Sequence, residues 1–404
     1  MKKTLISKGI LALAAAAAFS STAMAGGWNR GEADTDILFE DGTVVSRAGI
    51  TYVSPRRDYS TVTIPPRGGV VESTDDRFSQ DYIIPSFAAK WQATDNFGCA
   101  FTYTQPFGAD AEYGPEAVAA SLTSGANGTG ATRKEFITNE YGATCDISAE
   151  MGKGRLHFLG GVFLQDFDYT ANTASGNLRL EDDAAFGYRI GVAYDITEYA
   201  MRVQLMYRSK IEHETNDGSF TWNPAAGFPP AVFGEQDAFG SGTLPQSLKL
   251  SLQTGVAPGW LVYGSVKWTD WSVMDNLNYS IYTPTAIAAL GVPGAGYIPR
   301  RDVYNWRDGW TIQAGVGHAF NEKISGTVNL TWDRGVDTGA DIYTDSWTVG
   351  AGVAVEAGPG ELRFGGAVSY LTSGEQSRAN AATYDATADA DWAYAVSGSY
   401  RITF

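Results

Sequence analysis

Eight basic residues recur at alternating positions of extended segments, and a column of this kind could bind the anionic head group of a solute. Within each segment they share a face with small and polar residues, opposite a face of aliphatic and aromatic residues. A basic residue at mid-depth on a lipid-facing surface costs about 2 to 4 kcal/mol, so the basic face is expected to line an interior. The alternative is that these cations pair with interior acids such as Glu140, Asp146 and Glu356, or with a plug. The eight residues are Arg189, Arg202, Arg208, Lys249, Lys267, Arg307, Arg363 and Arg401.

Histidine and cysteine chemistry has less support. The three histidines, His157, His213 and His318, lie on separate segments, which gives little support to a Ser/His/acid set for hydrolysis. Cys99 and Cys145 fall on neighbouring segments in the same outward register, which leaves open a cross-strand disulfide or two inert thiols. No Cys/His spacing indicates a metal site, and we expect no catalytic residue, metal or cofactor.

The element that positions Lys267 is a strand with two unlike faces. In GWLVYGSVKWTDWS (259–272) the even positions are apolar with a tryptophan at each end, and the odd positions include the lysine. Trp260 and Trp268 are eight residues apart, roughly 26 Å along a strand and about 20 Å along the membrane normal once strand tilt is included. This spacing is close to the height of an apolar band, so the even face is predicted to contact lipid and the odd face a lumen.

The same alternation recurs in fourteen segments, joined by connections that are alternately very short and long. An even number of strands with short turns at one end is typical of a bacterial outer-membrane barrel, and closure pairs every backbone group. The sequence therefore predicts an all-β fold, a fourteen-stranded antiparallel transmembrane barrel. The predicted strands are 43–54, 80–92, 97–106, 135–149, 155–167, 182–195, 199–213, 244–256, 260–274, 307–320, 323–335, 344–356, 361–372 and 390–404.

The ends of the chain and its charge agree with export to the outer membrane. Residues 1–25 combine three lysines, a short apolar stretch and Ala23-Met24-Ala25, which together indicate a secretory signal peptide. Residues 43–404 are expected to form the barrel, whose last strand ends on Phe404, and segment 26–42 precedes it; the family resemblance described below implies that 26–42 is an N-terminal plug, or hatch. The formal net charge of −16 argues against a nucleic-acid partner.

The long connections are apolar for exposed segments, which favours an interaction with greasy molecules or packing of the loops over each other. They include FTWNPAAGFPPAVF (220–233) and YSIYTPTAIAALGVPGAGYIP (279–299), and AEYGPEAVAASL (111–122) is compatible with a short helix. Arg56-Arg57 and Arg300-Arg301 lie near the outer rim, where they either contact lipopolysaccharide phosphates or are simply solvated.

Three stretches resemble the FadL/TodX family of outer-membrane transporters for long-chain fatty acids and other hydrophobic compounds. The most recognisable is LPQSLKLSLQTGVAPGWLVYGSVKWTDWSVMDNL (244–277), and the others are YTQPFGADAEY (103–113) and YRSKIEHE (207–214). The similarity extends diffusely over nearly the whole mature chain. Segment 26–42 is shorter than the hatch of the family and lacks its Asn-Pro-Ala.

The resemblance implies loop capture of a hydrophobic ligand, a hatch in the lumen, basic residues around the head group, and lateral exit through an interruption of the third strand. Gly98 and Pro106 bracket the matching strand and are the expected positions of that interruption. For the head group the resemblance favours Arg307 in YNWRDGW, with Lys267 and Arg208 as further ligand-binding residues.

Together these observations predict a monomeric outer-membrane transporter for hydrophobic molecules, with long-chain fatty acids as the expected ligand and outer-membrane lipid and lipopolysaccharide as its surroundings. A general diffusion porin for small polar solutes is the first alternative. An outer-membrane hydrolase that uses His213 is the second.

Overall fold

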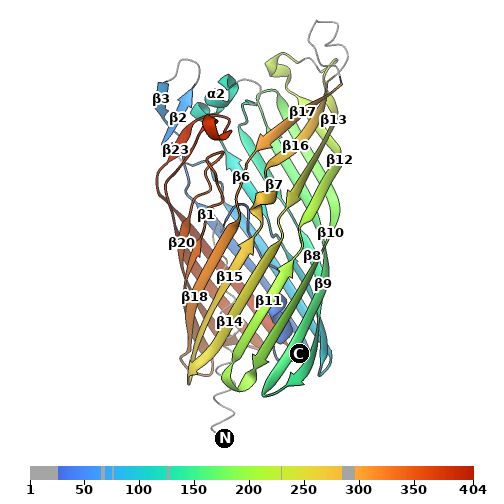
Figure 1. Cartoon of the computed structure of the whole chain (residues 1–404), viewed down its shortest axis with the longest axis vertical. Coiled ribbons are helices and arrows are strands. Elements are labelled where there is room, and N and C mark those ends of the chain that lie inside the picture. Colours follow the sequence, from blue (N-terminus) through green and yellow to red (C-terminus); the bar gives the residue numbers. More distant parts are fainter. Residues whose placement is uncertain (1–25, 65–68, 75–76, 125–127, 229, 284–295) are drawn as a thin grey trace.

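A computed structural model describes residues 26–64, 69–74, 77–124, 128–228, 230–283 and 296–404 (Figure 1). The predicted signal peptide and residues 284–295 of the apolar connection lie outside the described residues. Strands dominate the chain, and no helix in the described part is long and apolar enough to cross a membrane.

Fourteen antiparallel strands form a closed ring, which confirms the predicted fold class. Each strand pairs with its neighbours along the chain, and β1 closes the ring by pairing with both β4 and β24. Their bounds agree with the predicted segments to within a few residues at most ends. The strands of the ring are β1 (Val44–Pro55), β4 (Tyr82–Thr94), β5 (Phe97–Thr104), β8 (Glu140–Met151), β9 (Gly154–Asn172), β10 (Gly176–Ile196), β11 (Met201–Arg208), β14 (Ser247–Ala257), β15 (Trp260–Thr269), β18 (Gly309–Ala319), β19 (Ile324–Asp333), β20 (Ser346–Ala357), β21 (Gly360–Leu371) and β24 (Asp391–Thr403).

The two faces of each strand meet different surroundings, as the alternation predicts. In β15 the outward Trp260 is 43% exposed, whereas the neighbouring Leu261 is fully buried. In β24 the outward Trp392, Tyr394 and Val396 are all exposed, and Ala393 and Ala395 are buried. Apolar side chains therefore cover the outside of the ring, as contact with lipid requires.

The two cysteines, for which the sequence left open a disulfide or two free thiols, lie on this outer face. Cys99 of β5 and Cys145 of β8 stand opposite each other and form a disulfide, with 4.0 Å between their Cα atoms. The third and fourth strands of the ring are thus joined covalently as well as by backbone hydrogen bonds.

Several strands continue as separate pieces beyond the membrane-spanning ring. Residues 168–181, which lie between the predicted strands 155–167 and 182–195 and were therefore expected to form a loop, belong almost entirely to β9 and β10, which form one long hairpin. The extensions are β6 (Gly108–Glu112), β7 (Arg133–Ile137), β12 (Ile211–Trp222), β13 (Glu235–Leu244), β16 (Asn276–Thr283) and β17 (Gly296–Val303).

A cap covers the end of the barrel opposite the C-terminus (Figure 1). It contains a second sheet made of β2 (Thr61–Ile64), β3 (Gly69–Glu72), β22 (Gly374–Gln376) and β23 (Ala386–Ala388). The expected helix in 111–122 is confirmed as α2 (Pro115–Thr123) and packs against β2. Short turns and the C-terminus lie at the other end, which is periplasmic in outer-membrane barrels. The 3-10 turns are η1 (Thr35–Phe39), η2 (Thr197–Tyr199), η3 (Pro224–Ala226), η4 (Trp271–Val273) and η6 (Arg378–Asn380).

Candidate functional site

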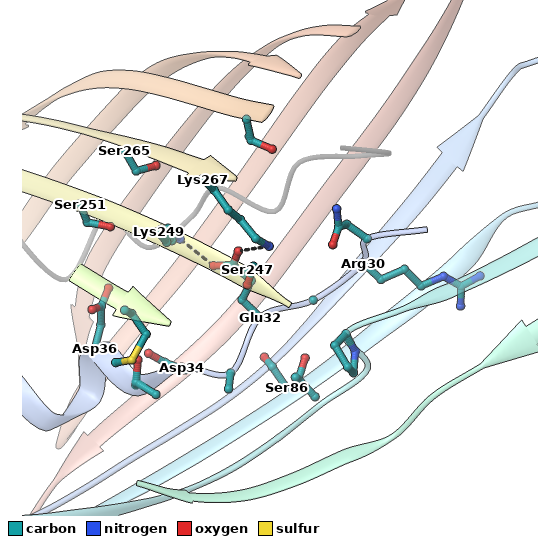
Figure 2. Close-up of a pocket in the computed structure, with 18 of the residues that line it drawn as sticks. Arg30, Glu32, Asp34, Asp36, Ser86, Ser247, Lys249, Ser251, Ser265 and Lys267 are labelled. Atoms are coloured by element: carbon teal, nitrogen blue, oxygen red, sulfur yellow. Dashed lines mark hydrogen bonds and ion pairs between the residues drawn. The ribbon is translucent and has the colours of Figure 1, made fainter. Parts of the chain in front are cut away.

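The N-terminal segment lies inside the barrel, where its acids meet the basic face of the strands. Glu32 is 2.6 Å from Lys249 and 2.7 Å from Lys267, and Figure 2 shows both lysines reaching it. Further contacts of this kind are Asp34 with Arg47 at 2.5 Å, Glu40 with the same Arg47, Asp36 with Arg202 at 3.3 Å, and Glu40 with Arg401 at 2.5 Å and Arg363 at 3.8 Å. Five of the eight predicted lumen cations, Arg202, Lys249, Lys267, Arg363 and Arg401, therefore contact acids of the N-terminal segment.

The lysine pair explains why an acid is needed at position 32. Lys249 and Lys267 stand directly opposite each other on β14 and β15, and like charges in that position repel. Burial alone would raise the pKa of Glu32, but the two ammonium groups outweigh it and hold the pKa below its usual range. Glu32 thus remains ionised and neutralises charge that the two strands cannot balance themselves.

Of the residues expected to bind a head group, Arg208 and Lys267 face the lumen and Arg307 does not. Arg208 and Arg189 share the buried carboxylate of Glu140, at 2.7 Å for Arg208. Arg307 precedes β18, which begins only at Gly309, so the strand alternation does not set its direction. Its side chain is exposed and donates from Nε to the carbonyl oxygen of Gly335 at 3.2 Å.

A cavity of about 370 Å³, here called the lumen cavity, lies against the N-terminal segment. Residues 29–36 form one wall, and polar and basic side chains of the ring, including Arg208 and Lys267, form much of the rest. The structure therefore brings two of the three predicted head-group residues to one cavity and leaves Arg307 outside it.

The barrel wall is interrupted where the third strand reaches Pro106. Pairing of β4 with β5 ends at Ser86 and Thr104, and a single bridge from Ser79 to Ala111 marks where contact resumes. Gly98 lies elsewhere, inside β5, where it pairs with Gln92 beside a register shift. Pro106 and Phe107 border the lumen cavity, and Ile83 and Phe87 of β4 are exposed on the lipid side.

The N-terminal segment fills this interruption. Arg30 and Gly31 donate backbone N–H groups to the carbonyl oxygens of Pro106 and Gln105, each at 2.8 Å. The backbone N–H of Gly108 donates to the carbonyl oxygen of Trp28 at 3.0 Å. The guanidinium of Arg30 lies 4.1 Å from the ring centroid of Tyr82, the first residue of β4. Figure 2 shows Arg30 pointing away from the Glu32 cluster.

A second cavity, here called the aromatic cavity, lies beneath the cap and has a volume of about 160 Å³. It is bounded by β6, α2 and the connections before β18 and β20, and most of its wall is apolar or aromatic. Trp28 forms its floor, with ring centroids 4.5 Å from Trp306 and 4.8 Å from Tyr304. Trp28 therefore borders the aromatic cavity while the next three residues border the lumen cavity.

Gly27 places Trp28 at this boundary. Its φ is +66°, and a Cβ there would lie 2.8 Å from Trp271 and 3.0 Å from Trp306. Only glycine fits both the backbone conformation and the space between two indole rings.

Polar groups of the aromatic cavity are mostly paired. Lys134 is 2.7 Å from Asp302, which also accepts a hydrogen bond from Tyr169 at 3.1 Å. His213 borders the same cavity, with Nδ1 2.7 Å from Asp182 and Nε2 3.2 Å from Gln165. Among the described residues, the hydrogen-bond partners of the His213 ring are Asp182 and Gln165, and neither is a serine.

The arginines expected at the lipopolysaccharide rim do not all lie at the surface. Arg57 is only 3% exposed and donates to the carbonyl oxygens of Asp389 at 2.8 Å and Thr372 at 2.9 Å, and to the Thr344 hydroxyl at 2.7 Å. Arg57 therefore connects three parts of the cap. The two expectations for this residue, contact with lipopolysaccharide phosphate and simple solvation, are both wrong, because its guanidinium is buried.

The sequence did not point to the aromatic cavity itself. Its side chains come from segments that share no period, such as Trp28, Tyr59, Tyr304, Asp341 and Tyr384. The available signal was compositional, because aromatic residues are frequent in the connections of an exported barrel.

A closed ring with a lipid-facing exterior, an N-terminal segment inside its lumen and an aromatic cavity under its cap is the architecture of an outer-membrane barrel. Residues 35–325 match the family described as outer membrane protein transport protein (OMPP1/FadL/TodX). The chain belongs to this family of outer-membrane transporters of hydrophobic compounds. The family accounts for the outer-membrane location and agrees with a transport role rather than an enzymatic one.

Solved structures agree with the fold. A FadL homologue of Pseudomonas aeruginosa is 15% identical with a TM-score of 0.69, covering 95% of this chain and 97% of that one. The Pseudomonas putida toluene transporter TodX is 13% identical with a TM-score of 0.58, covering 91% and 92%. The Ralstonia pickettii toluene transporter TbuX is 13% identical with a TM-score of 0.60, covering 95% and 97%. No curated protein sequence matches the chain.

Proposed function

We propose that this protein takes up small hydrophobic molecules by capture in the aromatic cavity and releases them sideways into the outer membrane at Pro106. The observation that supports the proposal is how three features follow one another from the cap inward. The aromatic cavity lies under the cap, the N-terminal segment lies beneath the cavity, and this segment fills the interruption in the wall between β4 and the end of β5. A ligand that passes Trp28 and Phe107 reaches the interruption without crossing the basic lower lumen.

The volume of the aromatic cavity suits a ligand with one aromatic ring. Apolar cavities of roughly 150 Å³ bind benzene, and this cavity measures about 160 Å³. Two solved relatives of similar fold are named as toluene transporters, which is compatible with this size class.

Long-chain fatty acids are the second candidate, and the basic lumen favours them. The alkyl chain would extend from the aromatic cavity, and the carboxylate would bind Lys267 after Glu32 leaves and Arg208 in competition with Glu140. Arg307 would take part only if its connection moved toward the lumen, because it borders neither cavity.

Filling the aromatic cavity tests the proposal. Ala117 of α2 is buried against the cavity, whereas Ala119 of the same helix does not border it. Ala117→Phe should strongly reduce uptake of labelled toluene by cells that express the protein, and Ala119→Phe should leave it near the wild-type rate. Labelled oleate in the same cells separates the two ligand candidates.

Two outcomes would contradict the proposal. Equal uptake by both variants would show that the ligand does not pass through the aromatic cavity. A large, steady single-channel current through the wild-type protein would favour the diffusion porin, because the plug described above must block such a current.

A further inference from the structure

Asp341 gives the aromatic cavity a polar group that the transport of a plain hydrocarbon does not require. It lies in the connection between β19 and β20 and borders the cavity. Both carboxyl oxygens accept from the indole N–H of Trp306, at 2.9 and 2.8 Å. Trp306 is buried behind it, so Asp341 stands between the indole and the cavity.

The charges around the cavity do not balance Asp341. Lys134, the one lysine or arginine among the described residues that border the cavity, is engaged by Asp302 at 2.7 Å. Glu135, which also borders the cavity, is paired with Arg133 at 3.0 Å. Among the described residues, the hydrogen bonds recorded for Asp341 come only from Trp306. A carboxylate-bearing ligand would thus find no free cation here.

The surroundings of Asp341, a partly buried residue at the wall of the cavity, favour the protonated form of its carboxyl. Burial raises the pKa of this carboxyl well above its usual range, and the nearby Asp337 raises it further, while the bond from Trp306 acts in the opposite direction. A protonated carboxyl can donate one hydrogen bond and still accept others. The single indole N–H leaves most of that capacity unused, so a ligand hydroxyl could exchange hydrogen bonds with Asp341.

We propose that the aromatic cavity selects small aromatic molecules that carry a hydroxyl group, with that hydroxyl bound to Asp341 and the ring packed among Tyr304, Tyr343 and Trp28. The inference rests on the proposed function and adds the substrate class. A site built to bond a hydroxyl disfavours the analogue that lacks it, because the polar group of the site is then left unpaired.

Binding of p-cresol and p-xylene to the purified full-length protein tests this directly. The two molecules have similar shapes, and a methyl group in p-xylene replaces the hydroxyl. Titration calorimetry with matched detergent blanks should show that Asp341→Leu weakens p-cresol binding about tenfold, the size of one net hydrogen bond. The same variant should change p-xylene binding less than twofold.

Two further variants control for the fold. Asp341→Asn keeps a donor and an acceptor and should retain p-cresol binding within about threefold of wild type. Asp345 lies in the same connection and also accepts from an indole, that of Trp332 at 3.2 Å, but it does not border the cavity. Asp345→Asn should leave both ligands unaffected, and the heat-dependent gel mobility of each variant reports whether the barrel is folded.

The possible results distinguish failure of the hydroxyl selectivity from failure of the proposed uptake function. Equal weakening of both ligands in Asp341→Leu, or tighter wild-type binding of p-toluate than of p-cresol, would overturn the hydroxyl selectivity and leave uptake of hydrophobic molecules standing. Failure of the wild-type protein to bind either p-cresol or p-xylene would overturn the proposed function itself.

Discussion

The backbone N–H of Arg30 donates to the carbonyl oxygen of Pro106 at a distance of 2.8 Å, so the N-terminal segment pairs with the third strand where β4 does not. These are ordinary backbone hydrogen bonds, each worth about 1 kcal/mol net. Under the proposed function, these bonds would have to break for the N-terminal segment to uncover the interruption beside Pro106, while the hydrogen bonds between the strands of the ring stay in place.

Gly27→Ala should loosen this closure. The substitution strains a backbone with φ of +66° and places a methyl group against Trp271, so Trp28 and the residues after it are displaced. We expect a higher ion conductance in planar bilayers than for wild type. Gly227→Ala is the matched control, since its φ is +91° but nothing lies within 4 Å of its added Cβ. Equal conductance of the two variants would argue against Gly27 as the residue that holds Trp28 in place.

Removing the charge of Glu32 should release the plug from the lysine pair. In Glu32→Gln, Lys249 and Lys267 face each other without a counter-ion, and their repulsion weakens docking of the N-terminal segment. Bilayer recordings should show more frequent openings, most clearly at low salt, where charges are least screened. Glu212→Gln removes an exposed pair with Lys210 and should not change the recordings. A similar effect from both variants would mean that the lysine pair does not hold the plug.

Acidification should stabilise the connection between β19 and β20. Burial raises the pKa of Asp337 to about 6 from a usual value near 3.8, although Arg307 and the bond from the backbone N–H of Tyr343 oppose the shift. A carboxyl with a raised pKa stabilises the folded connection fully below pH 3.8, and this contribution is lost as the pH rises through 6. Amide exchange in residues 335–345, corrected for its intrinsic pH dependence, should therefore be slower at pH 5 than at pH 7. Asp337→Asn should reduce the difference, and the remainder is expected to come from Asp341, whose pKa is also raised by burial.

The disulfide between Cys99 and Cys145 should stabilise the barrel and direct the opening. It closes a loop with a sequence separation of 46, for which chain entropy predicts about 4 kcal/mol of stabilisation. The paired substitution of both cysteines by alanine should lower the free energy of unfolding in urea by up to that amount. Because the bond ties β5 to β8, the proposed opening is expected on the β4 side of β5. If the double cysteine-to-alanine variant is destabilised but transports at the wild-type rate, the disulfide stabilises the barrel but does not direct the opening.

The alternation of apolar and polar residues predicted the strands correctly within the membrane-spanning part of the barrel. The fourteen strands and the outward register of Trp260 and Cys99 follow from alternation, because lipid on one face and a polar lumen on the other demand different side chains. Beyond the membrane both faces meet water or the cap, which explains why 168–181 was expected to be a loop and is a hairpin. Arg307 shows the same limit, since its strand begins two residues later. Asp341 and Trp28 meet only through the tertiary fold, which no local pattern encodes.

A cross-link between positions 29 and 107 tests the central claim most directly. Asn29 and Phe107 form an antiparallel bridge, and the hydrogen bonds on either side of it make this the close, non-hydrogen-bonded kind of pair, which suits a disulfide. In Asn29→Cys/Phe107→Cys the oxidised protein should still bind ligand but should not transport it, and a reductant should restore transport. The single variants control for the loss of Phe107, and reduced wild type controls for the native disulfide. Transport by the oxidised double variant at the rate of the reduced one would contradict an exit that opens when the N-terminal segment leaves Pro106.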